Sequence, residues 1–169
     1  MMRRKRYLFF LLLIGMMSIY GTCRYSLKDV SIPPEVKTVK VNLFENRARY
    51  NNPRLAPGLT DKLRQKIVNQ TRLSQTNNDA HYEISGQITD YSLSTSGISN
   101  QQASSNNLNV SVHINFINRL DTKKNFEADI TRNFPFSASL SLQQAEASLG
   151  DQIINNLTDE IFNRIFSNW

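Results

Sequence analysis

Alternation of apolar and polar residues over 108–116 constrains the fold of this chain more than any other sequence feature. Every second residue of LNVSVHINF is apolar, from Leu108 to Phe116, and the residues between them are polar. Neighbouring side chains of a β-strand point to opposite faces of the sheet, so this pattern predicts a strand with one buried face. The stretch NFEADITRNFPF, residues 125–136, continues the alternation after the short turn DTKK. Together the two stretches predict a β-hairpin.

A second alternating stretch, residues 81–97, changes phase part-way along. Its apolar residues are first Tyr82, Ile84 and Ile88, and then Tyr91 and Leu93. One extra residue around Thr89–Asp90 would produce that change, which predicts a β-bulge. Residues 94–107 are rich in Ser, Asn and Gln and poor in apolar side chains. They predict an exposed loop between this strand and the strand that begins at Leu108.

Two segments show the four-residue apolar spacing that is typical of helices. The first lies near residues 57–71, and its apolar face consists of Leu59, Leu63 and Ile67. Pro57 suits the first turn of this helix. The second runs from Ser141 toward the carboxyl end, with a stripe of Ala145, Leu149, Ile153, Leu157, Ile161 and Ile165. Ser141 and Gln144 have the spacing of a capping box, and we interpret Gly150 as a close approach of this helix to the sheet.

A short stretch ahead of the first helix, VKTVKVNLF, also alternates and places Val39, Val41 and Leu43 on one face. The order of elements is therefore β-α-β-β-β-α. Each element has one apolar side to bury, and the economical solution is an α+β two-layer sandwich. Both helices then pack on one face of a mainly antiparallel four-stranded sheet. We expect residues 36–169 to form this single domain.

The amino-terminal segment has the layout of a secretory signal, with basic residues 3–6 followed by an apolar run over 7–20. That run is shorter than the roughly 20 residues that a transmembrane helix needs. Cys23, the only cysteine, comes next in SIYGTC, which resembles the lipobox of bacterial lipoproteins. We expect cleavage of residues 1–22, lipidation of Cys23 and an extended lead over residues 23–35. An uncleaved membrane anchor is the alternative.

Charge argues against a nucleic-acid partner. The whole chain carries 20 basic and 14 acidic side chains, a net charge of +6, but residues 1–22 hold four of the basic residues and none of the acidic ones. From Cys23 onward the net charge is therefore only +2. Nucleic-acid binders cluster basic side chains on one face, and no such cluster is evident in this sequence. Arg24 follows the cysteine without an acidic neighbour, a pattern that resembles sorting to the outer membrane with the domain facing the periplasm.

Enzymatic signatures are also lacking in the sequence. The two histidines, His81 and His113, lie in predicted strands outside the apolar phase, and the single cysteine is assigned to the anchor. A metal site needs several clustered ligands, and no nucleophile elbow, phosphate-binding loop or dinucleotide glycine motif is present. We therefore expect no catalytic residues, no metal and no cofactor. A hydrolase whose carboxylates converge from separate strands is the alternative.

The arrangement of a lipobox, a short lead and this order of elements resembles the LPS-assembly lipoprotein family (LptE). The local sequence carries the resemblance in CRYSLKDVSIPPEVKTVKVNLFENRARYNNPRLAPGLTDKLRQKI and in RLSQTNNDAHYEISGQITDYS. The resemblance implies an outer-membrane lipoprotein that plugs the β-barrel of the LPS translocon, LptD, and supports its assembly. It also implies help in moving lipopolysaccharide to the outer leaflet. A periplasm-facing accessory lipoprotein of another envelope machine remains the alternative.

Lipopolysaccharide carries phosphates, which bind arginine and lysine side chains. Two small basic groups lie in predicted loops: Arg47, Arg49 and Arg54 before the first helix, and Arg119, Lys123 and Lys124 at the turn of the second hairpin. We predict the turn group, and with it Arg47 and Arg49, as lipopolysaccharide-binding residues. Ordinary solvated surface charge is the competing interpretation.

Overall fold

The computed structural model describes residues 32–99 and 102–167. Cys23, the predicted signal and most of the predicted lead therefore lie outside the described residues. The elements in chain order are β1 (Thr38–Val41), β2 (Glu45–Asn46), α2 (Leu55–Gln70), β3 (Ser74–Gln75), β4 (Tyr82–Ser99), β5 (Gln102–Asn118), the 3-10 turn η1 (Thr122–Lys124), β6 (Phe126–Ser137) and α3 (Leu142–Phe166).

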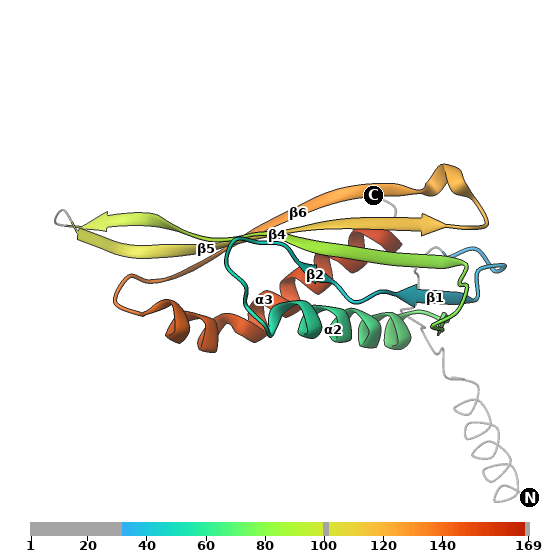
Figure 1. Cartoon of the computed structure of the whole chain (residues 1–169), viewed down its shortest axis with the longest axis horizontal. Helices are drawn as coiled ribbons and strands as arrows, with labels where there is room; N and C mark the ends of the chain where they lie inside the picture. The colour runs from blue at the N-terminus through green and yellow to red at the C-terminus, as the bar shows by residue number, and fades with distance from the viewer. Residues whose placement is uncertain (1–31, 100–101, 168–169) are drawn as a thin grey trace, which may run out of the picture.

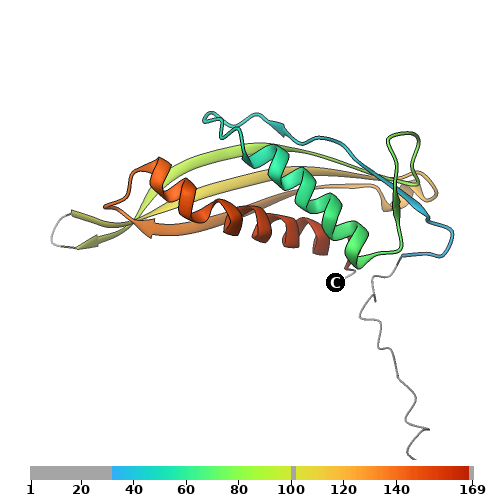
Figure 2. The ribbon, with the colours of Figure 1, turned by 90° about the horizontal axis from the view of Figure 1, so that it is seen from below.

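Both helices cover one face of a single sheet, as Figures 1 and 2 show. The α+β two-layer class predicted from the sequence is thus confirmed. The buried side chains between the layers come from the predicted apolar faces, among them Leu59, Leu63, Ile84, Val112 and Ile161. Neither α2 nor α3 lies on the opposite face of β4, β5 and β6.

The prediction of a mainly antiparallel four-stranded sheet is wrong in strand number and partly in direction. The sheet has six strands in the order β3-β1-β4-β5-β6, and β2 also pairs with β4. β1 runs parallel to β4, with Val39 opposite Tyr82, because the chain returns through α2 before it re-enters the sheet. β2 and β3 have only two residues each, and so short a strand shows no alternation that a sequence pattern could reveal.

The central hairpin of β4 and β5 is longer than predicted. The bulge is confirmed, because the register shifts between Ile88 and Asp90. The predicted loop over 94–107 is wrong for most of its length: β4 continues to Ser99 and β5 starts at Gln102. β6 pairs with β5 only as far as Ser105, so the hairpin runs beyond the three-stranded part as a two-stranded ribbon (Figure 1). Residues 94–107 hold few apolar side chains, so no alternation in the sequence marks this part of the strands.

The chain leaves the sheet after Val41, which corrects the prediction for Leu43. Leu43 is 63% exposed, whereas the next residue, Phe44, is only 2% exposed. The backbone N–H of Phe44 donates to Thr60 Oγ1 on α2 at 3.0 Å, and this bond turns the chain so that the aromatic ring enters the core. A continued strand would have buried Leu43 instead.

The helix starts agree with the sequence. Ser141 Oγ accepts from the N–H of Gln144 at 3.3 Å, and Gln144 Oε1 accepts from the N–H of Ser141 at 2.9 Å, so the capping box is confirmed. The interpretation of Gly150 as a close approach is wrong, because a Cβ at that position would meet nothing within 4 Å. Close approaches lie at two other glycines: a Cβ at Gly58 in α2 would be 2.7 Å from Ile154 Cδ1, and a Cβ at Gly86 in β4 would be 2.8 Å from the Phe44 ring.

Candidate functional site

The predicted basic group after β5, Arg119, Lys123 and Lys124, lies on the turn between β5 and β6 and is called the turn cluster. Both lysines are exposed on η1. Lys124 Nζ lies 3.9 Å from Asp121 Oδ2, a distance at the limit of an ion pair. Because these ammonium groups are held loosely, they are accessible to an anionic ligand.

Arg119 is bound more firmly than the two lysines. Its Nη2 donates to Glu83 Oε2 at 2.8 Å, and its Nη1 lies 3.5 Å from Asp79 Oδ1. Glu83 in turn accepts from Asn42 Nδ2 at 2.9 Å. Arg119 therefore ties the end of the β4–β5 hairpin to the segment after β1, and much of its hydrogen-bonding capacity is already used.

The second predicted basic group, Arg47, Arg49 and Arg54, lies on the segment between β2 and α2 and is called the loop cluster. All three side chains are exposed. Arg47 pairs with Glu45, with 2.9 Å between Nη2 and Oε2, while Arg49 makes no ion pair within the described part of the chain. The first two arginines thus lie at the surface of the segment that follows β2.

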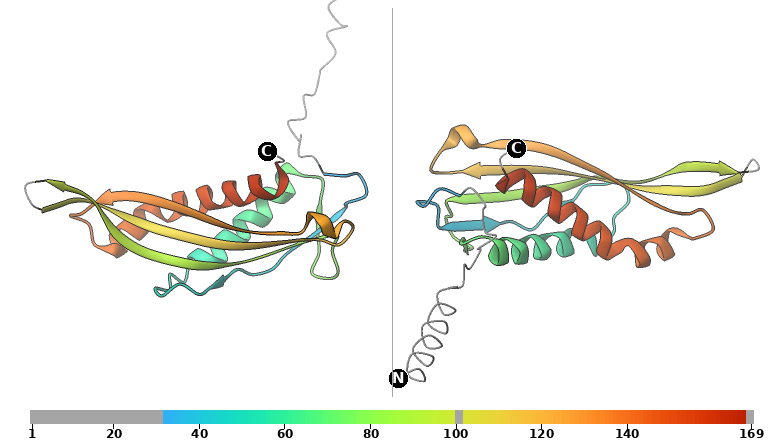
Figure 3. Two further views of the ribbon diagram at one scale, coloured as in Figure 1. Left: turned by 90° about the horizontal axis from the view of Figure 1, so that it is seen from above. Right: turned by 180° about the vertical axis from the view of Figure 1, so that it is seen from behind.

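The structure does not bring the two clusters together. Asn46, just before the loop cluster, pairs with Ile88 of β4, whereas Asn118, just before the turn cluster, pairs with Tyr82. Six residues of strand separate these positions, which is about 20 Å at the usual rise of ~3.3 Å per residue. Figure 3 shows the η1 turn at one end of the sheet, and the segment between β2 and α2 lies away from that end. The predicted residues therefore form two separate surfaces.

The ionisation of Glu83 makes the stability of the fold around the turn cluster depend on pH. Hydrogen bonds to its ionised form, from Arg119 first and from Asn42 second, lower the pKa of Glu83 below its ordinary value of 4.5. The folded state thus holds this carboxyl ionised more strongly than the unfolded chain does. Its contribution to stability is complete above the unfolded pKa and is lost as the pH falls through the lowered folded pKa.

We therefore expect Glu83→Gln to lower the melting temperature at neutral pH, by an amount that shrinks as the pH falls below about 4.5. Thermal unfolding of the two proteins between neutral pH and about pH 3 measures this. Glu35→Gln is the matched control, because Glu35 is an exposed carboxylate whose replacement should change little. A Glu83→Gln effect of constant size at every pH would contradict this account of the turn.

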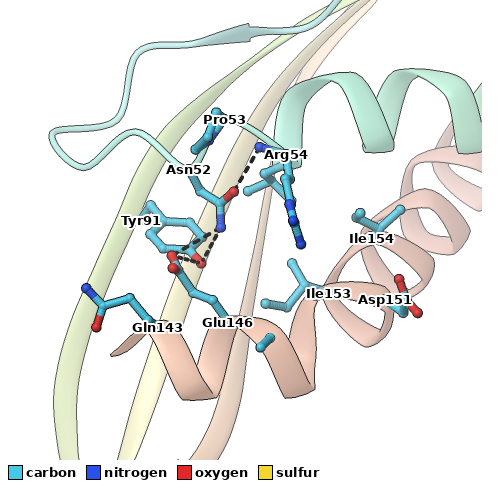
Figure 4. Close-up of a pocket in the computed structure, with 12 residues that line it drawn as sticks. Asn52, Pro53, Arg54, Tyr91, Gln143, Glu146, Asp151, Ile153 and Ile154 are labelled. Atoms are coloured by element: carbon cyan, nitrogen blue, oxygen red, sulfur yellow. Dashed lines mark hydrogen bonds between the residues drawn. The ribbon is translucent and has the colours of Figure 1, made fainter. Parts of the chain in front are cut away.

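A cleft of about 490 Å³ lies between the start of α2, β4 and the first half of α3 (Figure 4). Tyr91 Oη donates to Glu146 Oε1 at 2.8 Å, and Asn52 Nδ2 donates to the same oxygen at 3.1 Å. The Tyr50 ring stacks on the Tyr91 ring, with 5.5 Å between centroids. Burial raises the pKa of the Tyr91 hydroxyl well above its ordinary value, so the phenol stays neutral and donates.

Sequence reasoning missed this cluster of Asn52, Tyr91 and Glu146. The β-bulge predicted around Thr89–Asp90 was the one signal available, because it turns Tyr91 toward the helix layer. The pattern could not show that Glu146, 55 residues later, would accept its hydrogen bond. The cluster joins the loop before α2, β4 and α3, and we interpret it as a structural connection that holds the loop cluster in place.

The open sheet face is the side of β4, β5 and β6 that faces away from the helices. Its side chains pair across β5 and β6: Ser111 Oγ lies 2.9 Å from Thr131 Oγ1, and His113 Nδ1 lies 2.8 Å from Asp129 Oδ1. Asn115 is opposite Glu127 in the same register. The buried residues between them point to the helices. The result is a broad, polar and hydrogen-bonding surface without an apolar patch along the described part of β5 and β6.

Neither a metal centre nor a membrane-spanning helix is found in the part of the chain that the structure describes. Over residues 32–99 and 102–167, no three His, Cys, Asp or Glu side chains are arranged to hold a metal ion. Among these residues, neither α2 nor α3 is long and apolar enough to cross a membrane. The expected lack of a catalytic site stays a prediction.

Solved structures that share this fold include two lipoprotein-sized domains of low sequence identity. The chain matches the crystal structure of a minor lipoprotein from Acinetobacter baumannii with a TM-score of 0.51 and 15% identity, over 79% of this chain and 92% of the other. It matches the hypothetical protein CT253 from Chlamydia trachomatis with a TM-score of 0.53 and 8% identity, over 79% and 99% of the two chains. At such identities the likeness concerns the fold alone. No curated protein matches the sequence significantly.

A match between the sequence and a family model identifies the family. The model of the LptE family, described as lipopolysaccharide-assembly, matches residues 36–165, which begin ahead of β1 and end in the last turn of α3. The match covers all the described strands and both helices. The chain therefore belongs to the LptE family of lipopolysaccharide-assembly lipoproteins, a non-enzymatic family that acts within the lipopolysaccharide transport machinery.

Proposed function

We propose that this protein is an outer-membrane lipoprotein that plugs the β-barrel of the lipopolysaccharide translocon, LptD, and supports assembly of that barrel. In this role it assists the transport of lipopolysaccharide to the outer leaflet. The match to the LptE family over residues 36–165 is the observation that carries the proposal. Cys23 is the proposed site of lipidation, which would anchor the domain on the periplasmic side of the outer membrane.

The open sheet face supports the plug. The lumen of an outer-membrane barrel is polar and hydrated, and its apolar residues face the lipid. A plug must therefore present hydrogen-bonding side chains, and the open face offers them in the paired rows that contain Ser111, His113 and Asn115. The helices shield the apolar core on the other side, so the domain needs no apolar contact with the barrel wall (Figure 2).

The first test asks whether the open face contacts the barrel. The double variant Ser111→Arg, Thr131→Arg places two long cations on that face, and Asn155→Arg places one on the exposed side of α3 as the control. Each tagged protein is purified in detergent from outer membranes, and the amount of barrel that accompanies it is measured. We expect a large loss of barrel with the double variant and no loss with the control.

Either of two results would contradict the proposed role as a barrel plug. Equal recovery of barrel with all variants would remove the open face from the interface. Recovery of a different envelope protein in near-stoichiometric amount, from membranes that contain the intact translocon, would favour the accessory lipoprotein of another machine. Mass spectrometry of the mature amino terminus tests the anchor separately, because lipidation of Cys23 adds the mass of its acyl chains.

The turn cluster is the proposed contact with lipopolysaccharide. Arg119 is engaged with Glu83, so Lys123 and Lys124 should carry most of the attraction to a phosphate. We expect the triple change of Arg119, Lys123 and Lys124 to alanine to weaken lipopolysaccharide binding about tenfold, equivalent to about 1.4 kcal/mol. Binding of labelled lipopolysaccharide to the purified protein measures this, and barrel recovery should stay unchanged.

The loop cluster provides the comparison. Arg47→Ala with Arg49→Ala removes two cations from a surface about 20 Å away along β4. A loss as large as that of the triple variant would assign the phosphates to the loop cluster, or to both clusters. Undiminished binding by the triple variant would rule out the turn cluster as the contact.

A further inference from the structure

The outer side of β6 is not paired with another strand in the described part of the chain. β6 is the last strand in the order β3-β1-β4-β5-β6, and only β5 lies beside it. Figure 1 shows β6 along the rim of the sheet. An edge strand of this kind presents backbone N–H and C=O groups to which another extended chain can bond. The outer side of β6 is called the free edge.

The other edges of the sheet are short or irregular, which is how proteins usually protect an edge strand from pairing. β2 and β3 have only two residues each. From Ile88 onward, the pairing of β4 with β5 shifts register three times. β6 differs from them, because all 12 of its residues pair with β5 in one unbroken register. Its free edge is therefore long and regular enough to take a further strand.

Hydrogen bonds at the end of β5 show which backbone groups of β6 point to the free edge. The N–H of Arg119 donates to the carbonyl oxygen of His81 at 2.9 Å, on the β4 side. The N–H of Asn118 donates to Asn125 Oδ1 at 2.7 Å, on the β6 side. Even-numbered residues of β5 therefore bond to β6, and their even-numbered partners bond back, because opposite residues exchange both hydrogen bonds. The odd-numbered residues of β6 thus point their N–H and C=O groups away from β5.

Pro135 supports this orientation independently. Proline has no N–H, and in an edge strand it occupies positions where that group would face away from the neighbouring strand. Pro135 is an odd-numbered residue within the regular pairing of β6 with β5. No other element of the described chain accepts a backbone hydrogen bond from the remaining odd-numbered N–H groups of β6, those of Glu127, Asp129, Thr131 and Asn133. These four donors extend over about 20 Å, at the usual rise of ~3.3 Å per residue.

The side chains along the free edge indicate the chemistry of a partner. Glu127 and Asp129 lie on the open sheet face, with side chains that are 64% and 74% exposed. The His113 ring contacts them from β5, at 3.6 Å and 2.8 Å respectively. On the helix side, Phe126 and Ala128 are only partly buried. Because side chains of neighbouring strands lie side by side on each face, an added strand would meet two carboxylates on one face and apolar groups on the other.

We propose that the free edge binds an extended protein segment, which joins the sheet as a further strand next to β6. The segment carries lysine or arginine at every second position, facing Glu127 and Asp129, and uncharged residues between them. A second copy of this chain is a poor match, because its own free edge would bring two more carboxylates to the same face, and like charges on neighbouring strands repel. This site goes beyond the plug, because it uses the backbone of an edge strand and needs no barrel.

Short peptides provide the first test. A capped nine-residue peptide of alternating threonine and lysine is titrated into the purified full-length protein in detergent, and its affinity is measured by calorimetry. The same peptide with glutamate in place of lysine should bind at least tenfold more weakly. Methylation of every backbone nitrogen of the lysine peptide keeps the charge but removes the hydrogen-bond donors, so it should also weaken binding at least tenfold. Undiminished affinity of the methylated peptide, or no binding of the lysine peptide, would overturn the proposal.

Variants of the free edge provide the second test. Thr131→Pro removes one N–H that points away from β5, as proline does naturally at position 135, and leaves the bonds to β5 in place. It should weaken binding of the lysine peptide about tenfold. Unchanged affinity of this variant would show that the peptide does not pair with the backbone of β6.

Neutralising the carboxylates tests the charge preference without a change in the backbone. Glu127→Gln with Asp129→Asn should weaken binding of the lysine peptide about fivefold, since exposed ion pairs contribute modestly. Asp61→Asn with Asp151→Asn is the matched control, because it removes two exposed carboxylates from α2 and α3 and should leave the affinity unchanged. An equal loss in both double variants would indicate attraction to the net charge of the protein and would overturn the assignment.

Amide hydrogen exchange, measured by NMR, observes the free edge itself. The N–H groups of Glu127, Asp129, Thr131 and Asn133 should exchange quickly in the free protein, and bound peptide should slow them at least tenfold. The even-numbered N–H groups of β6, already bonded to β5, should change little. Slowing that does not follow this alternation, or no slowing at all, would overturn the proposal.

Sedimentation of the protein without peptide tests the competing occupant. We expect a monomer. A dimer that dissociates when Thr131 is replaced by proline would assign the free edge to a second copy of the chain and reject the basic segment. These measurements contain no barrel protein, so they can fail while the plug stands, and the reverse holds too.

Discussion

Replacing Gly86 by alanine should lower the free energy of unfolding by about 1–3 kcal/mol, the usual range for overpacking a well-filled core. The new Cβ would lie 2.8 Å from Phe44 Cε2 and 3.0 Å from the backbone oxygen of His113. The Phe44 side chain is fixed in the core at 2% exposure, and the His113 oxygen belongs to the neighbouring strand. Neither neighbour can move without disturbing the sheet, so the native state must take up strain. Chemical denaturation of the wild type and the variant measures the loss.

A double-mutant cycle tests whether Phe44 is the cause. Phe44→Leu removes the ring atoms that a Cβ at Gly86 would meet, so the alanine should cost less in that background. Gly150→Ala is the matched control, because its Cβ would meet nothing within 4 Å and alanine favours a helix by about 1 kcal/mol over glycine. The control should therefore be neutral or stabilising. If Gly86→Ala lowers the free energy of unfolding equally in the wild type and in Phe44→Leu, contact with the Phe44 ring is not the source of the strain.

The features of the fold that depend on neighbouring residues were predictable from the sequence. Alternation from Leu108 to Phe116 marked the buried face of β5, and all five apolar residues of that stretch are buried. The change of parity near Thr89 predicted the bulge, and the pair Ser141 and Gln144 predicted the start of α3. In each of these cases the signal is local, because the residues that determine the structure are neighbours in the chain.

The remaining features depend on contacts between distant residues. Leu43 was assigned to the core because it continued an alternation, but the bond from Phe44 to Thr60 turns the chain instead. The parallel pairing of β1 with β4 depends on how α2 returns the chain, which no alternation records. Residues 94–107 hold few apolar side chains, and the β4–β5 pairing there comes from backbone hydrogen bonds that are independent of side-chain pattern.

The same distinction applies to the candidate sites. The sequence named Lys123 and Lys124 because they are adjacent in a turn, and the structure places both at the surface. It could not show that Arg119 would be engaged by Glu83, which lies 36 residues away. Nor could it show that Lys124 and Arg164 would line one cavity, since they are 40 residues apart in the chain. The sequence shows where a charged residue lies in the chain, but it does not show which distant residue that charge contacts.

Two buried threonines on the helices should respond to valine with opposite signs. Thr60 Oγ1 accepts from the Phe44 N–H at 3.0 Å and donates to the Ala56 carbonyl at 2.8 Å. Thr60→Val keeps the shape but leaves the Phe44 N–H buried without an acceptor. A buried unsatisfied group costs about 1–3 kcal/mol, so we expect a loss of stability in that range. Thr60→Ser, which retains the hydroxyl, should lose less.

Replacement of Thr158 on α3 by valine should change stability in the opposite direction. Its side chain is fully buried, and its Oγ1 has no hydrogen-bond partner in the described part of the chain. Thr158→Val removes a hydroxyl that was desolvated without compensation, so stability should rise by about 1 kcal/mol. Threonine and valine have similar helix propensities, so propensity contributes little to either variant. Denaturant midpoints of Thr60→Val and Thr158→Val should therefore move to opposite sides of the wild type. If both midpoints fall, the account of Thr158 as an unsatisfied hydroxyl is wrong; if both rise, the bond from Phe44 to Thr60 does not stabilise the fold.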